Sequence, residues 1–167
     1  IMKQLSVLFS AVALFIASSA VKAQKVAHLD VNAVLSLMPE KKKADEKLEA
    51  FSKAKGAEIE KQAQAWQAEV AKYQQGAAKL TEAQRKAKEE ELTKKQQNIQ
   101  GMQQAAQKDL AEKSEAEYAP IEKKFQEAVN KVAKANGWDY ILDGNSSLFI
   151  YKAGPDATAA VKKELGL

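Results

Sequence analysis

The sequence of 167 residues has no cysteine, one histidine, three prolines and seven glycines. Without cysteine the chain forms no disulfide, carries no thiol nucleophile and offers no thiolate ligand to a metal ion. The single histidine, His28, cannot build a histidine cluster, and we interpret it as a structural residue of a predicted strand. No glycine-rich phosphate loop is present. These absences argue against an enzyme and predict no catalytic, metal or cofactor site.

Long hydrophobic runs are also scarce, and the one that stands out lies at the beginning of the sequence. Met2 and Lys3 precede an apolar run over residues 5–17, and a small-residue pattern ends at Ala23. This order predicts a secretory signal peptide over residues 1–23 and an exported protein that is soluble after cleavage. A membrane anchor is the alternative, but the run is shorter than the roughly 20 residues of a spanning helix. Removing Lys3 and Lys22 leaves 24 basic and 22 acidic residues.

Alanine, lysine, glutamate and glutamine dominate residues 40–136, where Pro120 is the one proline. This composition and an apolar spacing of mostly three, four or seven residues are typical of long helices that pack along a coiled-coil-like seam. Gly76 weakens the helix, and Thr81 with Gln84 forms a capping-box pattern. We therefore predict an antiparallel helical hairpin over residues 40–120 with a turn near 76–81, and a kink at Pro120.

The register of this hairpin follows from arithmetic, because antiparallel helices of equal rise pair residues whose numbers add to a constant. Three pairs that each sum to 158 are expected to lie level: Ile59 with Ile99, Trp66 with Leu92, and Leu48 with Leu110. The chain would then fold back near Lys79. Gly56 and Gly101 would lie almost opposite each other, which suggests a hinge. The alternative is that these glycines let the two helices approach closely.

The segment before the hairpin, VAHLDVNAVLSLMPE, predicts a strand over residues 25–31 and a short helix through Leu37. Asp30 or Asn32 can cap that helix. The next helix is expected to begin at Pro39, because proline is favoured at the first helical position.

The segment after the hairpin, DYILDGNSSLFIYK, has two apolar runs around a turn cluster. We predict a β-hairpin with strands over 140–142 and 148–151, preceded by a helix end at Asn136 and Gly137. A last short helix carrying Val161 and Leu165 follows residues 154–156. The fold class is then mainly α with a small β-body (α+β), in which residues 24–39 and 121–167 form the body.

A body of about sixty residues with three short strands rarely stabilises itself, and its sheet keeps open edges. We therefore predict an obligate oligomer that associates through the body, with the helical arms projecting from it. The residues expected at this interface are Leu29, Ile141, Leu142, Phe149 and Ile150.

With the two end segments quoted above, the final helix DATAAVKKELG and the long hairpin between them, the chain resembles the Skp (OmpH-like) family of periplasmic chaperones. The resemblance implies a homotrimer shaped like a jellyfish, which holds unfolded outer-membrane β-barrel proteins between its arms and keeps them from aggregating without ATP. It carries over no catalytic residue. Adaptable arms suit a binder of many unfolded chains. Candidate client contacts are Trp66, Val70, Tyr73, Ile99 and Met102, although most of them, Tyr73 least clearly, are better interpreted as part of the seam of the hairpin.

A rival interpretation is a structural coiled-coil spacer or scaffold of the cell envelope with one defined partner. A spacer should have strict apolar heptads and stiff arms, whereas this seam is thin. Residues 41–43 are all lysine and could make weak contact with lipid headgroups. Acidic residues are interleaved along the helices, so these lysines are better interpreted as part of a solvated face, and no nucleic-acid partner is expected.

Overall fold

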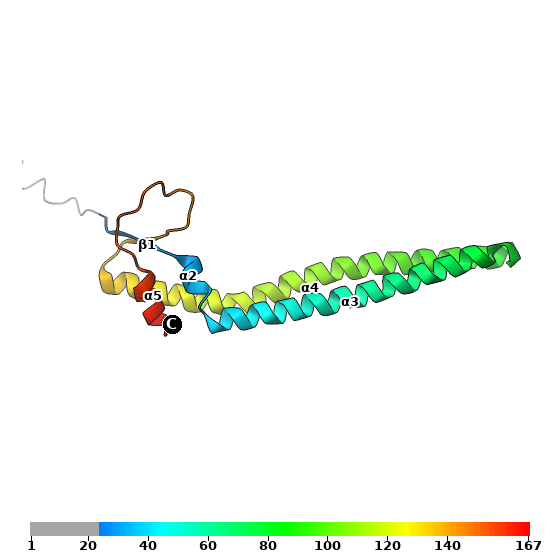
Figure 1. Ribbon diagram of the computed structural model, residues 1–167, viewed down its shortest axis with the longest axis horizontal. Coiled ribbons are helices and arrows are strands. Elements are labelled where there is room, and N and C mark those ends of the chain that lie inside the picture. Colours follow the sequence, from blue (N-terminus) through cyan, green and yellow to red (C-terminus); the bar gives the residue numbers. More distant parts are fainter. Residues whose placement is uncertain (1–23) are drawn as a thin grey trace, which may run out of the picture.

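The computed structural model describes residues 24–167, and the predicted signal peptide lies outside the described residues. Figure 1 shows a small body at one end and two long helices that extend from it side by side. The elements are β1 (Val26–Leu29), α2 (Val31–Leu35), α3 (Pro39–Gly76), η2 (Ala77–Lys79), α4 (Glu82–Asn136), β2 (Tyr140–Asp143) and α5 (Thr158–Leu165). The described chain is therefore mostly helical with one small sheet.

The sheet of the body consists of β1 and β2, which run parallel with Val26 opposite Tyr140 and Leu29 opposite Asp143. The predicted β-hairpin is wrong, because residues 148–151 form no strand and pair with nothing in the sheet. Besides β2, strand β1 is bridged by the chain around Asp156. His28 there accepts a hydrogen bond from the backbone of Ala157 at 2.8 Å and donates one to Pro155 at 2.9 Å.

The helix boundaries follow their capping residues. Asp30 caps α2 by accepting a hydrogen bond from the backbone N–H of Ala33 at 2.8 Å, and Pro39 is the first residue of α3. Thr81 and Gln84 make both bonds of the capping box at the start of α4, and Gly137 ends α4 with a φ of 64°. That left-handed conformation suits glycine, so the predicted stop is confirmed. Helix α4 continues through Pro120 without interruption.

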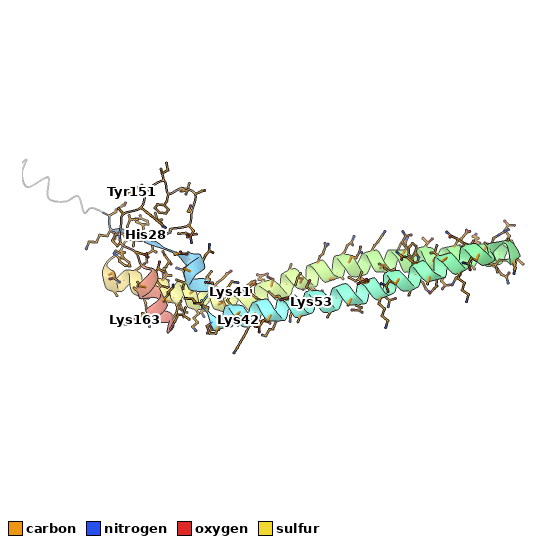
Figure 2. All side chains as sticks on the ribbon, in the orientation of Figure 1. His28, Lys41, Lys42, Lys53, Tyr151 and Lys163 are labelled. Atoms are coloured by element: carbon orange, nitrogen blue, oxygen red, sulfur yellow. The ribbon has the colours of Figure 1, made fainter. Side chains whose placement is uncertain are left out.

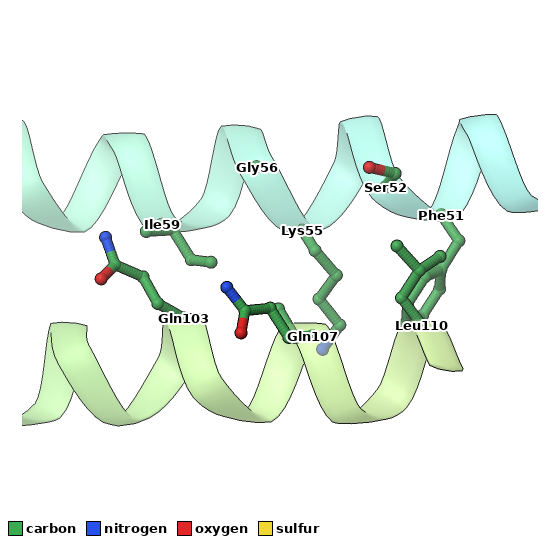
Figure 3. Close-up of a pocket in the computed structure, with 9 residues that line it drawn as sticks. Phe51, Ser52, Lys55, Gly56, Ile59, Gln103, Gln107 and Leu110 are labelled. Atoms are coloured by element: carbon green, nitrogen blue, oxygen red, sulfur yellow. The ribbon is translucent and has the colours of Figure 1, made fainter. Parts of the chain in front are cut away.

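The two long helices lie next to each other in opposite directions, since Lys47 reaches Glu117 near the body and Tyr73 reaches Glu89 near the turn. Trp66 and Leu92, which were predicted to lie level, are in contact, because the indole Nε1 donates to the Leu92 carbonyl at 2.9 Å. The remaining register is shifted. Figure 3 shows Leu110 beside Phe51, and Lys55 reaches Asp109 at 3.8 Å, so residues of α3 face residues of α4 that come later in the chain than predicted.

The shift has a physical cause in the turn. The helical path continues as the 3-10 turn η2 to Lys79, so the outgoing arm is longer than the sequence suggested, and the chain crosses over at Leu80 and Thr81. Gly56 consequently lies across from the stretch that carries Gln103 and Gln107, and not level with Gly101 (Figure 3). A side chain at either glycine would meet no atom within 4 Å, so neither is needed for close approach of the helices.

The hydrophobic core lies in the body. Its main cluster joins β1, α2, the end of α4 and α5, and consists of Ala27, Leu29, Val34, Ala128, Val132, Ala157 and Val161. A second cluster of Met38, Ala44 and Ile121 seals the base of the arms. Between Ala44 and Ile121, a stretch that the structure describes completely, Leu92 is the only buried residue. The arms therefore project from a packed base and have almost no core of their own.

Candidate functional site

The residues predicted for association fall into two groups in the structure. Leu29 is 2% exposed and packs in the core of its own chain, which leaves nothing for a second chain to cover. Ile141 is half-buried against the same core, because alternate residues of β2 point to opposite faces. Leu142 is 43% exposed, and Phe149 is half-buried in the loop that follows. Ile150 is fully exposed.

Three further apolar residues, Tyr140, Leu148 and Tyr151, are exposed in the same part of the body. Figure 2 shows Tyr151 on the loop that stands away from the arms. The sequence signal for the last two was the continuous apolar run 148–151, which does not alternate and so leaves no face for solvent. We call Tyr140, Leu142, Leu148, Ile150 and Tyr151 the exposed body residues. Single surface apolar residues are common, but this many in one small body are not.

The loop that carries Leu148, Ile150 and Tyr151 is fastened at its base. The backbone N–H of Gly144 donates to the Leu29 carbonyl at 2.8 Å, and Lys152 donates to the Gly144 carbonyl at 2.9 Å. Asn145 donates to the Asp30 carboxylate at 2.6 Å. The hydrogen bonds from Ala33 and Asn145 lower the pKa of Asp30 from its ordinary value. The loop is thus held at its ends while its apolar residues face outward.

A charged network joins the arms near the turn and consists of Glu69, Lys88, Glu91 and Lys95. Lys95 Nζ lies 2.6 Å from Glu69 and 3.0 Å from Glu91, and Lys88 Nζ lies 2.8 Å from Glu91 and 3.4 Å from Glu69. The pKa of Glu69 is lowered chiefly by the hydrogen bond from Lys95, and that of Glu91 chiefly by the one from Lys88. The same bonds raise the pKa of both lysines. The network therefore needs ionised carboxylates.

The residues predicted as client contacts are all half-buried along the arms. Trp66 and Tyr73 use their polar atoms within the hairpin, because the indole donates to the Leu92 carbonyl and the phenol donates to Glu89 at 2.6 Å. That hydrogen bond to Glu89 is the main cause of the raised pKa of Tyr73. Val70 and Ile99 have no polar side-chain atom, and the Met102 sulfur accepts one long hydrogen bond, from Asn98 of the same helix at 4.0 Å. Trp66 and Tyr73 therefore help to close residues 66–76 and 82–95, which we call the upper arm.

Two clefts lie along the seam: one of about 700 Å³ near the turn, lined by Tyr73, Gly76 and Leu80, and one between the upper arm and the body. Residues 51–59 and 103–110, which we call the middle arm, enclose a cleft of about 530 Å³. Phe51, Gly56 and Ile59 line it from α3, and Gln103, Ala106 and Leu110 line it from α4 (Figure 3). The three large apolar residues of this cleft are only half-buried. We call it the middle cleft.

The base of the arms is closed again by polar contacts. The Asp45 carboxylate accepts hydrogen bonds from Lys41 at 2.7 Å and from the phenol of Tyr118 at 2.6 Å. Both bonds lower the pKa of Asp45, with Lys41 the larger cause. Lys47 pairs with Glu117 at 2.8 Å. Lys41 is thus engaged within the arm, which leaves Lys42 and Lys43 as the exposed members of the lysine run.

Over residues 24–167, no group of three or more histidine, cysteine, aspartate or glutamate side chains is arranged to hold a metal ion. His28 lies 3.8 Å from the Asp156 carboxylate in the body. Of the helices that the structure describes, none is both long and apolar enough to span a bilayer.

Comparison with known proteins agrees with this architecture. The model of the family described as outer membrane protein (OmpH-like) matches residues 25–165. A crystal structure of an OmpH-like protein from Caulobacter crescentus CB15, for which a role as an outer membrane chaperone has been suggested, superimposes with a TM-score of 0.71. It is 16% identical, and the match covers 86% of this chain and 85% of the other. No curated protein matches the sequence. The family match spans both ends of the body and the whole of the arms, and the chain belongs to the OmpH-like family.

Proposed function

We propose that the protein is an ATP-independent holdase chaperone of the periplasm, which binds unfolded outer-membrane proteins and prevents their aggregation. The observation that carries this proposal is the pair of long arms whose apolar residues are only half covered. Arms without a core of their own offer many weak, adaptable contacts, which suit a binder of diverse unfolded chains. Membership of the OmpH-like family supports the same function.

We further propose that copies of the chain associate through the exposed body residues, most simply as a homotrimer. The body is small and its two-stranded sheet keeps an open edge, so association would cover apolar surface that one chain leaves in water. Ile150 is the sharpest test, because it is fully exposed and its replacement removes no contact within the chain. Ile150→Asp should lower the oligomeric mass in sedimentation while the helical content stays unchanged. Lys53→Asp on the arm is the matched control, and an unchanged mass for Ile150→Asp would contradict the interface.

Val70, Ile99 and Met102 are the proposed client contacts of the seam, with the rings of Trp66 and Tyr73 contributing their half-exposed sides. Gly56 and Gly101 remain the proposed hinge positions, now offset from each other along the arms. A hinge at these glycines predicts faster amide hydrogen exchange around them than on either side. Amide exchange that is as slow at these positions as on either side of them would contradict the hinge.

The proposed function is tested with the purified mature chain and several unrelated outer-membrane β-barrel proteins, each diluted from denaturant at stoichiometric ratio without nucleotide. Light scattering should fall for all of them. A chain with Ile150→Asp serves to show whether assembly is required. No effect on any β-barrel would instead favour a structural spacer of the envelope, for which a single defined partner should be recovered.

A further inference from the structure

We propose that the middle cleft is a binding site for extended segments of unfolded polypeptide, and that it takes up an apolar side chain flanked by an acidic residue. This inference rests on the proposed chaperone function and gives it a location. The family match and the proposed client contacts, which lie within residues 66–73 and 99–102, do not identify this site.

The middle cleft is bounded on both sides by contacts between α3 and α4, and it is therefore not the loosened end of the hairpin. On its body side the arms are joined by Lys47 with Glu117 and by Asp45 with Tyr118. On its other side they are joined by Trp66 with Leu92 and then by the charged network. Contacts between the two helices therefore bound a space of about 530 Å³ at both ends, and a separate cleft of about 700 Å³ lies beyond them near the turn.

The cleft lacks a side chain that would cover its apolar walls. Phe51, Ile59 and Leu110 each keep part of their apolar surface in water, and Ala106 lines the same cleft with a small side chain. Figure 3 shows the three larger side chains in the gap between the helices. Gly56 adds no side chain at the edge. An inserted apolar side chain would cover surface that the hairpin cannot cover by itself, which is favourable in proportion to the apolar area removed from water.

The cleft has a polar rim. Gln103, Gln107 and Ser52 line the cleft beside its apolar residues. A glutamine amide supplies both donors and acceptors, and a serine hydroxyl supplies one donor and two acceptors. Such groups can pair with the unpaired backbone N–H and C=O groups of an extended chain, which a lipid tail does not possess. The rim therefore favours polypeptide over an amphiphile.

Two lysines lie beside the apolar wall at one end of the cleft. Lys55 Nζ and Lys113 Nζ lie 5.7 and 5.6 Å from the centre of the Phe51 ring, within the range of a cation–π contact. Asp109 approaches Lys55 only to 3.8 Å. The two ammonium groups give this end of the cleft a positive balance, which complements an acidic residue next to the inserted side chain.

Photocrosslinking tests the assignment directly. Because the chain has no cysteine, Gln103→Cys and Gln104→Cys each introduce a unique thiol, the first at the cleft and the second on the adjacent position outside it. Both variants are labelled with benzophenone maleimide, mixed with an unfolded outer-membrane β-barrel protein and irradiated. The label at position 103 should crosslink about fivefold more strongly than the label at position 104. Burial of one to two methylene groups strengthens binding by about this factor or more.

A substitution that fills the cleft provides the second experiment. Ala106→Leu occupies the cleft, and Ala105→Leu makes the same change on the neighbouring exposed position. The first should reduce crosslinking from position 103 to the level of position 104, and the second should leave it unchanged. The helical content and the melting temperature of both variants are measured to detect a folding defect. If Ala106→Leu does not fold, Ser52→Leu, which fills the cleft from the opposite wall, is used in its place.

The remaining outcomes separate the site from the function. Equal crosslinking at positions 103 and 104, with aggregation still suppressed, would overturn the cleft and leave the chaperone function standing. Crosslinks between copies of the chain without any client, or protection of position 103 by anionic lipid vesicles alone, would overturn it in favour of self-association or lipid. Failure of the unmodified chain to suppress aggregation would overturn the proposed function and the cleft together.

Discussion

The upper arm and the middle arm are built from the same few residue types and each contains a cleft, yet the upper arm is crossed by more side-chain contacts between the two helices. The upper arm has a buried leucine, an indole hydrogen bond across the helices and a network of four charges. The middle arm has three half-buried apolar residues around a cleft. Composition alone therefore does not determine how well a thin helical hairpin closes. A small number of cross-helix contacts determines it.

The largest expected effect comes from removing the one buried side chain of the arms. Leu92 is 7% exposed, and Leu92→Ala should lower the local free energy of opening of the upper arm by about 2 to 3 kcal/mol, the lower part of the usual range for this change. Native-state hydrogen exchange of the upper-arm amides measures it. Leu110→Ala, at the half-buried position beside the cleft, is the matched control and should cost less. A larger loss for Leu110→Ala would reverse the comparison.

The middle arm should respond to added helix propensity instead. Gly56→Ala should stabilise it by about 1 kcal/mol, because glycine is that much poorer than alanine inside a helix. The new methyl group meets no atom within 4 Å. Gly101→Ala is the paired change on α4 and should act similarly. Thermal unfolding followed by circular dichroism gives the shift in Tm, and a decrease for Gly56→Ala would show that the backbone there is needed as it is.

A smaller effect is expected from the hydrogen bond of the indole. Trp66→Phe keeps a large aromatic ring but removes the donor to the Leu92 carbonyl, which should cost about 1 kcal/mol. Hydrogen exchange in the upper arm should quicken while exchange in the middle arm stays unchanged. Tyr73→Phe removes the bond to Glu89 nearer the turn and provides the comparison. If exchange in the two regions quickened equally, the arms would open as one unit.

The smallest effect is the response of the charged network to acid. The folded-state pKa values of Glu69 and Glu91 are lowered, so their contribution to stability is complete above the ordinary value of 4.5 and is lost as pH falls through the lowered values. Salt should weaken the same contacts by screening them. Trp66 fluorescence in a Trp138→Phe background should change below pH 4.5 and in high salt. Lys95→Gln should remove most of that response, and an undiminished response would place its origin outside the network.

The helices and strands of this molecule are easier to predict from the sequence than the way in which they pair. The capping pattern of Thr81 and Gln84 and the glycine at 137 are local signals, and the structure uses both. The strand partner was missed because β1 and β2 are more than a hundred residues apart, and two apolar runs around a turn look the same whether they pair with each other or with a distant strand. Local spacing has no information about that choice.

The candidate site shows the same limit. The thin seam was readable from the spacing of apolar residues, but the middle cleft depends on the register, and the register depends on η2 at the turn. The charged network was also hidden, because lysine and glutamate recur along both helices and their spacing within one helix does not say which pairs meet across the arms. Leu148 and Tyr151 were missed as surface residues because the run 148–151 was assigned to a strand.

Hydrogen exchange along both arms of the full chain, with and without an unfolded outer-membrane β-barrel protein, tests the account most directly. Without the client, amides of residues 51–59 and 103–110 should exchange faster than those of residues 66–76 and 82–95. With the client, protection should increase most in the middle arm and less around Val70 and the other proposed client contacts of the upper arm. Uniform protection along the arms, or protection gained only near the turn, would contradict the account.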